Sequence, residues 1–282
     1  MEQNTFTISP MSQFISLTPG EVYHGTINVA NPSGSATELE FSARITPYSV
    51  IGQDYQADLA TVSNFSQMVD WITIDTPTGT VAPNSTTEIP FTITVPTTPP
   101  AGGQYATIVV SQSSPTDSST VGSTVGMASI IYADVAGETT HSGEVLETSL
   151  PGFSITAPVP ITTTITNTGN VHETATVDLS VVNNVTGERI FPKGDQPGTF
   201  SEVIMPDSTR LLVRQLDGLP ALGAVQVTQT VTYNGTESTF SGTLVLCPLW
   251  FIAIVAFAIF SVVFMLVFRA RSRKQYKPSA GS

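Results

Sequence analysis

Charged residues are scarce in this sequence of 282 residues, in which Asp, Glu, Lys and Arg together make up only 11%, against about 25% in an average soluble domain. Cysteine is scarcer still, because Cys247 is the only one. A disulfide within the chain is therefore excluded, and the stability of any domain must come from its hydrophobic core. Since many bacterial surface domains are built without cysteine, this scarcity favours a bacterial origin.

Basic residues are nearly absent from most of the chain. The part before Pro248 contains all 22 acidic residues but only five basic ones, which gives it a net charge of −17. The other five basic residues lie in the last fourteen positions. A body this acidic is repelled by phosphate backbones, which excludes nucleic acid as a partner. The acidic residues are scattered and form no D-x-[DN]-x-[DN]-G loop, so the charge does not indicate a calcium site.

Sequence motifs of catalysis and of cofactor binding are also missing. The three histidines, His24, His141 and His172, are far apart in the sequence, and none belongs to an H-E-x-x-H pair. The sequence has no G-x-S-x-G nucleophile motif and no glycine-rich phosphate loop that opens a helix. We therefore expect a protein that is not an enzyme and that uses no metal or other cofactor.

The residues that are abundant are Thr, Ser, Val, Gly and Pro, a mixture typical of many short strands broken by turns. Such turns include Asn234-Gly235. Alternation of apolar and polar residues is the period of a strand with one buried and one solvated face. It occurs in the segments 23–29, 38–43, 91–95 and 161–165. The sequence therefore predicts an all-β fold.

One order of turns and strands occurs twice along the chain. The segment 31–34 (NPSG) corresponds to 167–170 (NTGN), and 82–86 (APNST) corresponds to 205–209 (MPDST). This repeat predicts two tandem immunoglobulin-like β-sandwiches. The predicted boundaries are 1–136 for the first sandwich, 137–147 for a linker or crossover, and 148–243 for the second sandwich.

Residues 249–268 form an uncharged apolar run of twenty residues. At 1.5 Å per residue a helix of this length spans a hydrocarbon core of about 30 Å. We predict a transmembrane helix at 244–268 and a basic tail at 269–282. A tryptophan suits the membrane interface, and a basic cluster after the helix is expected to face the cytoplasm. The residues predicted to anchor this topology are Trp250, Arg269, Arg271, Arg273 and Lys274.

These signals predict a single-pass protein of the cell membrane, with an extracellular N-terminal body and a cytoplasmic C-terminal tail. Residues 1–4 do not resemble the start of a signal peptide, so we expect that a signal peptide has been removed. Cys247 lies at the outer boundary of the helix. It is either a small apolar residue there or the site of an intermolecular disulfide.

The first predicted sandwich contains a stretch at 46–68 that the second lacks. It carries Tyr48 and Tyr55 in a long connection, and long loops on rigid scaffolds often carry function. The stretch either binds a ligand or caps one end of the sandwich. Trp71 is either a residue of the core or its rim, or a platform for stacking a sugar. The candidate ligand-binding residues are Tyr48, Tyr55 and Trp71.

Several motifs, most of them in the first half, resemble those of WxL-interacting proteins, a family of bacterial surface proteins. These are Phe6–Pro10, Leu17–Gly20, Val29–Pro32, Tyr48-Ser49, Phe65–Val69, Val81–Thr86, Val95-Pro96, Pro100–Tyr105 and, in the second half, Met205–Thr209. The resemblance implies an N-terminal peptidoglycan-binding immunoglobulin-like domain, a second sandwich, one transmembrane helix and a basic tail.

The sequence and this resemblance together predict a membrane-anchored, non-catalytic adhesion protein of the cell surface. It would bind cell-wall glycan or another envelope protein through the insertion and the exposed sheet of the first sandwich. The alternative is a structural or accessory subunit of a membrane complex, in which the sandwiches are spacers. The expected partners are cell-wall polymer or a surface protein, and the membrane.

Overall fold

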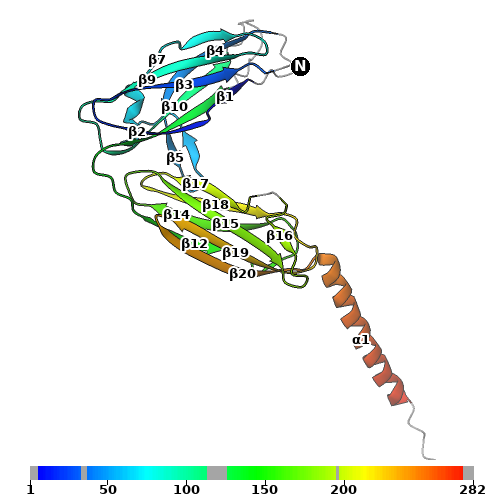
Figure 1. The fold of residues 1–282 in the computed structure, drawn as a ribbon. Coiled ribbons are helices and arrows are strands. Elements are labelled where there is room, and N and C mark those ends of the chain that lie inside the picture. The colour runs from blue at the N-terminus through cyan, green and yellow to red at the C-terminus, as the bar shows by residue number, and fades with distance from the viewer. Residues whose placement is uncertain (1–5, 33–36, 113–125, 195–196, 276–282) are drawn as a thin grey trace, which may run out of the picture.

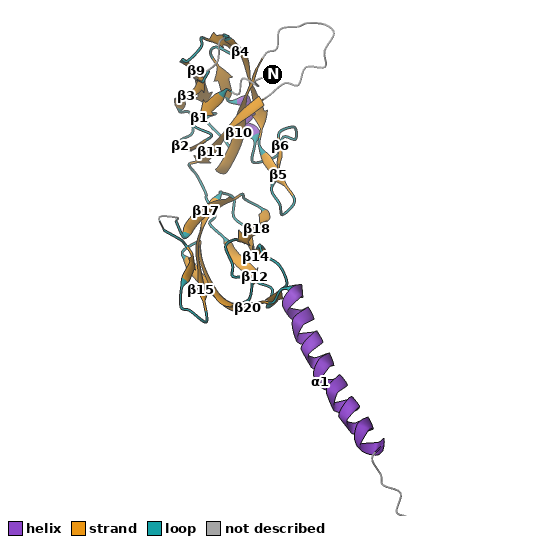
Figure 2. Cartoon of the chain, turned by 90° about the vertical axis from the view of Figure 1, so that its right-hand side faces the viewer, coloured by secondary structure: helices purple, strands orange, loops and turns teal. Residues whose placement is uncertain are grey.

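The computed structural model describes residues 6–32, 37–112, 126–194 and 197–275. Two β-sandwiches follow one another at a bend, and a long helix leaves the second one (Figure 1). The view turned by 90° shows the same order (Figure 2). The predicted all-β fold with two tandem immunoglobulin-like sandwiches and one C-terminal helix is therefore confirmed.

The first sandwich packs a four-stranded sheet, ordered β1-β3-β9-β7, against a five-stranded sheet, ordered β2-β11-β10-β4-β8. Strand pairs are antiparallel except for β2 and β11, which are parallel. The bounds are β1 Thr7–Ser9, β2 Ser12–Leu17, β3 Val22–Ala30, β4 Leu39–Pro47, β7 Ile72–Ile74, β8 Thr78–Val81, β9 Thr86–Thr94, β10 Gly102–Gln112 and β11 Gly126–Val135. Between β4 and β7 lie a small hairpin, β5 Ser49–Ile51 with β6 Gln56–Asp58, and a 3-10 helix at Gln67–Asp70.

The second sandwich packs the three-stranded sheet β12-β14-β18 against a larger sheet ordered β13-β20-β19-β15. In the larger sheet β15 pairs with β19 on one side and with both β16 and β17 on the other. The bounds are β12 Gly143–Ser149, β13 Phe153–Ser154, β14 Val159–Asn167, β15 Glu173–Asn183, β16 Arg189–Phe191, β17 Thr199–Ile204, β18 Ser208–Leu216, β19 Gly223–Tyr233 and β20 Thr236–Leu246.

Alternating residues of the strands fill the two cores, as the period-two pattern predicts. In β3, Ile27 and Val29 are buried, and in β9 the neighbouring Phe91 and Ile93 are buried with them. The strand β14 alternates in the same way along its whole length. The intervening threonines of β14, Thr162, Thr164 and Thr166, are partly exposed, so the strand has two different faces.

The sequence repeat corresponds to one structural arrangement that both sandwiches use. The buried amide of Asn31 donates to the carbonyl of Val81 over 3.1 Å, and that of Asn167 donates to the carbonyl of Ile204 over 3.0 Å. Each of these carbonyls lies two residues before the proline of a P-[ND]-S-T turn. In both turns the serine hydroxyl donates to the carbonyl three residues earlier over 2.6 Å. Each asparagine therefore ties its own sheet to the opposite one.

The helix α1 spans Leu249–Gln275, and its segment Leu249–Arg269 is long and apolar enough to cross a membrane, with a mean hydropathy of 3.0. It begins later than the predicted position 244, because residues 244–246 are the end of β20, whose Leu244 and Leu246 contribute to the second core. β12 likewise begins inside the predicted linker 137–147.

Candidate functional site

The hairpin of β5 and β6 reaches from the first sandwich to the second (Figures 1 and 2). At its tip the carbonyl of Gln53 accepts a hydrogen bond of 2.8 Å from the backbone N–H of Leu211 in β18. The rest of the insertion is held in the first sandwich, where the Gln104 amide donates to the carbonyl of Asn64 over 2.9 Å. The insertion therefore couples the two sandwiches.

Tyr55, on the same hairpin, is bound to the second sandwich by a closed ring of hydrogen bonds. Its hydroxyl oxygen accepts from the backbone N–H of Met205 over 3.0 Å and donates to Ser208 Oγ. The Ser208 hydroxyl donates back to the carbonyl of Met205 over 2.6 Å. The guanidinium of Arg210 lies 4.6 Å from the centre of the Tyr55 ring. Burial is the main reason that the pKa of Tyr55 is raised, so the hydroxyl stays protonated and able to donate.

The three candidate ligand-binding residues do not form one site. Tyr48 and Tyr55 pack beside Tyr105, Tyr132 and other side chains at the junction of the sandwiches. Trp71 lies elsewhere, partly buried against the core of the first sandwich. The sequence predicted that the insertion either binds a ligand or caps one end of the first sandwich. It did not predict a contact between the insertion and the second sandwich. Ligand binding by these residues stays a prediction.

A second contact joins the sandwiches between the start of β10 and the loop before β15. The backbone N–H of Gly103 donates to the carbonyl of Asn170 over 2.7 Å. Gly102 has a φ of +103°, and a Cβ at this position would lie 2.5 Å from the same carbonyl oxygen. Glycine is therefore required here both for the backbone conformation and for the close approach of the second sandwich.

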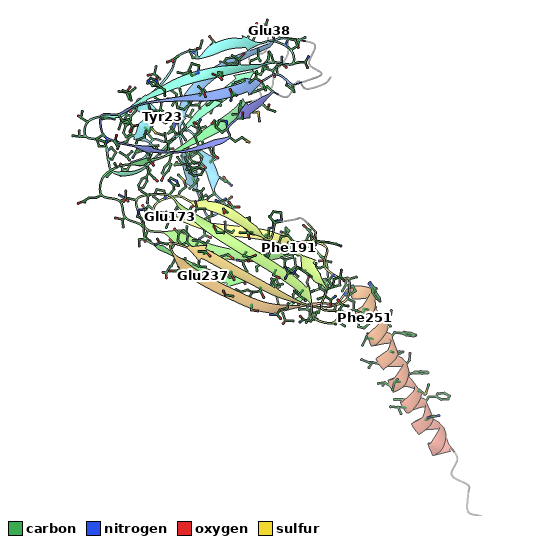
Figure 3. All side chains as sticks on the ribbon, viewed as in Figure 1. Tyr23, Glu38, Glu173, Phe191, Glu237 and Phe251 are labelled. Carbon is green, nitrogen blue, oxygen red and sulfur yellow. The ribbon has the colours of Figure 1, made fainter. Side chains whose placement is uncertain are left out.

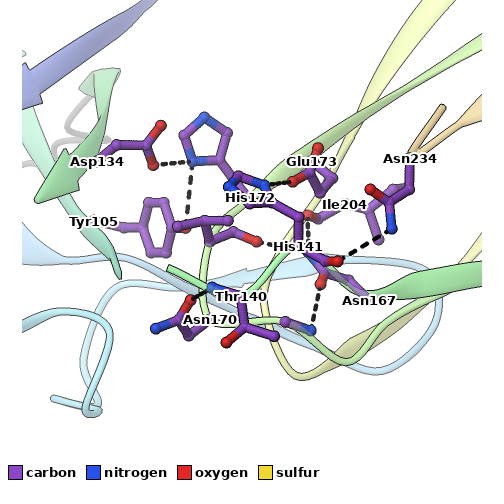
Figure 4. Close-up of polar contacts among 12 residues, drawn as sticks. Tyr105, Asp134, Thr140, His141, Asn167, Asn170, His172, Glu173, Ile204 and Asn234 are labelled. Atoms are coloured by element: carbon purple, nitrogen blue, oxygen red, sulfur yellow. Dashed lines mark hydrogen bonds and ion pairs between the residues drawn. The ribbon is translucent and has the colours of Figure 1, made fainter. Parts of the chain in front are cut away.

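His172 stands in this second contact, among Tyr105 and two carboxylates (Figure 4). Its Nδ1 lies 3.3 Å from the Tyr105 hydroxyl and 3.3 Å from Asp134 Oδ1. Burial lowers the pKa of His172, and the attraction of Asp134 and Glu173 opposes this only in part. The imidazole is therefore held neutral in the junction at pH 7.

β18 is the longest edge strand among the described residues. It pairs with β14 over nine residues without a register shift, and its other side faces no strand. The contact with Gln53 means that the N–H of Leu211 points away from β14. Because such directions alternate in an antiparallel ladder, the backbone groups of Val213 and Gln215 point the same way. Within the described ranges no backbone hydrogen bond satisfies them.

The other edge strands differ from β18 in length or regularity. In the part of the chain that the structure describes, each of them has seven residues or fewer. β12 and the short β16 also carry register shifts in their pairing. Short strands and bulges are two of the ways in which sheet proteins avoid unwanted pairing at an edge. β18 lacks both forms of protection.

A groove runs beside the open edge, between β18 and the strands β15, β16 and β17 of the facing sheet; we term it the β18 groove. Its first part is a cavity of about 160 Å³ that begins near the hairpin tip, and its second part is a cavity of about 510 Å³. Arg214 lines both parts. The apolar floor consists of Leu179, Val181, Ile190, Phe191 and Phe200.

Three of the five basic residues in the acidic body line the β18 groove: Lys193, Arg210 and Arg214. Arg210 forms an ion pair of 2.7 Å with Glu202. Arg214 belongs to no ion pair among the described residues, and its guanidinium lies 5.1 Å from the ring centre of Phe200. The groove thus combines an open strand edge, an apolar floor and a cation that is available to a carboxylate.

The remaining predicted residues lie outside this region. Trp250 is the second residue of α1, with its ring centre 5.8 Å from that of Phe251. Arg269 ends the apolar segment. The side chains of Arg271, Arg273 and Lys274 lie outside the described residues. Among the residues that are described, no group of three or more His, Cys, Asp and Glu could hold a metal ion.

Reasoning from the sequence did not find the β18 groove. A signal was present, because Arg210 and Arg214 are two of only five basic residues in the body. They are four positions apart in the run 208–216, so in a strand they share a face. The alternation of that run is weak, however, since Leu211, Leu212 and Val213 are consecutive.

No family model matches the chain, and no curated protein matches it. Similar solved structures include the class 5 fimbriae chaperone CfaA, with a TM-score of 0.40, 14% identity, and coverage of 87% of this chain and 100% of that one. The E. coli chaperone DraB has a TM-score of 0.39, 13% identity, and coverage of 84% and 97%. A chain of the Salmonella enterica complex of the SafA pilin with the SafB chaperone has a TM-score of 0.42, 12% identity, and coverage of 87% and 98%. Values this low do not assign the chain to a family.

These neighbours are described as fimbrial chaperones, not as peptidoglycan-binding surface proteins, so the predicted kinship with WxL-interacting proteins is wrong. The motifs quoted for it are turns followed by strands, which unrelated sandwiches share. The predicted function in adhesion to the cell wall is wrong for the same reason, and so is the alternative of a spacer subunit in a membrane complex. The expectation of a protein that is not an enzyme agrees with these neighbours. Three of the neighbouring structures are described as containing a chaperone with a pilin or a tip subunit as its partner.

Proposed function

We propose that this chain is a membrane-tethered, non-catalytic polypeptide-binding protein that takes up an extended segment of another protein in the β18 groove. The observation that carries the proposal is the unsatisfied outer edge of β18 beside an apolar floor. Both the surface and the ligand differ from those of the cell-wall protein that the sequence predicted.

An extended segment would bind first through its backbone. The outward N–H and C=O groups of Val213 and Gln215 have the spacing of an open strand, and Gln53 already begins a ladder at Leu211. A partner strand would continue this ladder. Main-chain pairing of this kind supplies affinity, and pockets for alternate side chains supply selectivity.

The side chains of the groove restrict which segments fit. Every second side chain of an added strand would face the floor near Phe191 and Phe200, which favours apolar residues at alternate positions. Arg214 favours a carboxylate opposite it, because complementary charge selects among partners. We therefore expect an alternating apolar and polar segment that contains at least one Asp or Glu.

Several of the structural neighbours are complexes of a chaperone with a pilin or a tip adhesin. For this chain we propose the same coarse class of partner, another protein of the cell surface. This proposal is supported by the chemistry of the β18 groove and not by the similarity to the solved chaperone structures.

We also propose that α1 holds the binding body at the extracellular face of the cell membrane. The support is the apolar segment Leu249–Arg269, the charge of −17 before Pro248, and the five basic residues from Arg269 onward. A tethered body would meet its partner at the membrane surface instead of free in solution.

The test uses the full chain in lipid nanodiscs and a fluorescein-labelled octapeptide of alternating threonine and valine with one central aspartate. Fluorescence anisotropy should show saturable binding. Val213→Pro removes one outward N–H without breaking the ladder to β14, a position where an edge strand tolerates proline. Loss of the added strand's contacts at this residue should weaken binding about tenfold, the equivalent of roughly 1.4 kcal/mol.

Matched charge variants separate the contribution of Arg214. Arg214→Gln should weaken binding of the aspartate peptide but not of the same peptide with asparagine. Arg189→Gln, which changes a basic residue of β16 that does not line the groove, should leave both affinities unchanged. If no peptide of this pattern binds the wild-type chain saturably, or if Val213→Pro binds it equally well, the proposal is wrong.

A further inference from the structure

The end of the second sandwich next to α1 is unusually apolar for a protein surface. Its turns and strand ends carry five large side chains that are between 40% and 81% exposed: Phe153, Ile155, Val185, Leu222 and Val245. We term these five residues the membrane-proximal rim. Exposed apolar residues that are scattered singly need no explanation, but several at one end of a domain indicate a contact surface.

Backbone pairing places the rim at the end of β20. Phe153 lies opposite Val245, the last residue but one of that strand. Leu222 directly precedes the residue that pairs with Leu246. The turn that carries Val185 is tied to the start of β19 by a backbone hydrogen bond of 2.9 Å. The rim therefore comes from three connections that meet where the chain leaves the sandwich.

Charge is almost absent from these segments. No Asp, Glu, Lys or Arg occurs in 148–172, 218–236 or 238–268. Among the described residues, the charged side chains of the neighbouring connections are Glu188, Arg189, Lys193 and Asp217, none of which lies in the segments that carry the rim. The body has a net charge of −17. The end of the second sandwich that carries the rim is therefore the part of the body that an anionic or apolar surface would repel least.

The connection between the sandwich and the helix is too short to hold them apart. Only Cys247 and Pro248 separate the end of β20 from the start of α1, and each residue spans at most about 3.6 Å. The N–H of Cys247 also donates to the carbonyl of Ser154 over 3.0 Å, which fixes the connection to the rim. The headgroup layer on each side of a bilayer is roughly 5–8 Å thick. A helix that begins in the hydrocarbon at Leu249 therefore brings the rim into that layer.

We propose that the membrane-proximal rim is a membrane-contact surface, seated among the lipid headgroups and upper acyl chains of the bilayer that α1 crosses. The proposal rests on the proposed membrane crossing and adds a second, peripheral contact to it. Two contacts fix the second sandwich against tilting about its short connection. The coupled first sandwich then projects from the membrane in a defined direction, with the β18 groove at a fixed height.

The test uses the full chain reconstituted in liposomes, with Cys247→Ser as the background. Single cysteines at Val185 and Leu222 are labelled with the environment-sensitive dye NBD. Glu237→Cys is the matched control, because Glu237 lies at the other end of the same sandwich, far from Phe251 (Figure 3). Quenching by a nitroxide carried on the lipid acyl chain is compared with quenching by aqueous iodide.

The labels at 185 and 222 should be quenched several-fold more by the lipid-borne nitroxide than by iodide, and the label at 237 should show the reverse. If all three labels respond alike to iodide and are spared by the nitroxide, the rim does not contact lipid and the proposal is overturned. Flotation of the liposomes with the protein checks separately that α1 is inserted. Peptide binding on the same samples checks the proposed function, which does not depend on the rim.

Discussion

At the scale of single residues, His172 is the group whose protonation is coupled to the junction of the sandwiches. Asp134 of β11 and Glu173 of β15 attract a proton to the ring, and Tyr105 faces the same nitrogen. Burial outweighs these attractions and lowers the pKa below its ordinary value of 6.5. The folded chain therefore binds fewer protons than the unfolded chain at mildly acidic pH, which makes stability fall on acidification.

The thermal stability of the chain should accordingly decrease as the pH is lowered from 7.5 through 6.5, down to the lowered pKa of the folded state. Each unit by which the pKa is lowered is worth about 1.4 kcal/mol. His172→Gln, which is neutral at all pH values, should flatten this slope in melting curves. His24→Gln, which changes an exposed histidine of β3, is the control and should leave the slope unchanged. An equal slope in His172→Gln would contradict this role.

At the scale of structural elements, the β5–β6 hairpin is one of the two contacts that couple the sandwiches. It is a small addition, with only three residues in each strand. It nevertheless places Tyr55 in a ring of hydrogen bonds with Met205 and Ser208, and Gln53 against Leu211. The tandem repeat alone predicts two separate domains, so cooperation between them depends on this inserted element together with the second contact, at Gly103 and His172.

Tyr55→Phe should weaken the coupling by about 1–3 kcal/mol, because it leaves the buried N–H of Met205 without its acceptor. Replacing residues 49–58 with a two-residue turn should remove the hairpin's share of the coupling and leave only the contact at Gly103 and His172, so that calorimetry should resolve two unfolding transitions instead of one. The control is Tyr23→Phe, whose hydroxyl makes no hydrogen bond among the described residues, and it should change little. A single, unshifted transition in the shortened chain would mean that the hairpin does not couple the domains.

At the scale of the whole molecule, charge and apolar length divide the chain into an acidic body, a neutral span and a basic end. A charge of −17 disfavours contact of the body with anionic lipid, while the apolar end of the second sandwich adjoins the helix. The bend at the junction (Figure 1) carries the first sandwich out of line with the second. The proposed orientation has the body outside the cell because the basic residues follow the helix.

Protease added to intact cells should therefore digest the body and leave only a short fragment that contains α1. An epitope added after Ser282 should be protected until the membrane is permeabilised. The positive-inside signal can be tested directly by changing Arg269, Arg271, Arg273 and Lys274 to Gln together, which should produce a fraction of inverted molecules. Protection of the body in intact wild-type cells would reverse the proposed topology.

The sequence by itself determined the classes of structure, because they follow from local periodicity. Alternation such as that of 23–29 gives a strand one apolar face, and an uncharged run of twenty apolar residues has the length of a helix that spans a bilayer. The repeated Asn31 and Asn167 also marked two copies of one sandwich. The end of β20 was misassigned at 244–246 because a buried strand and a membrane helix are both apolar there.

Only the tertiary structure decided what lies between and beside the sandwiches. The contact of Tyr55 with Ser208 joins residues 153 positions apart, and no local pattern encodes such a pairing. The open edge of β18 exists because, among the described residues, no further strand pairs beyond it in the sheet β12-β14-β18, which is a property of strand order and not of the strand's own residues. The rim next to α1 likewise arises from three distant connections that the fold brings together.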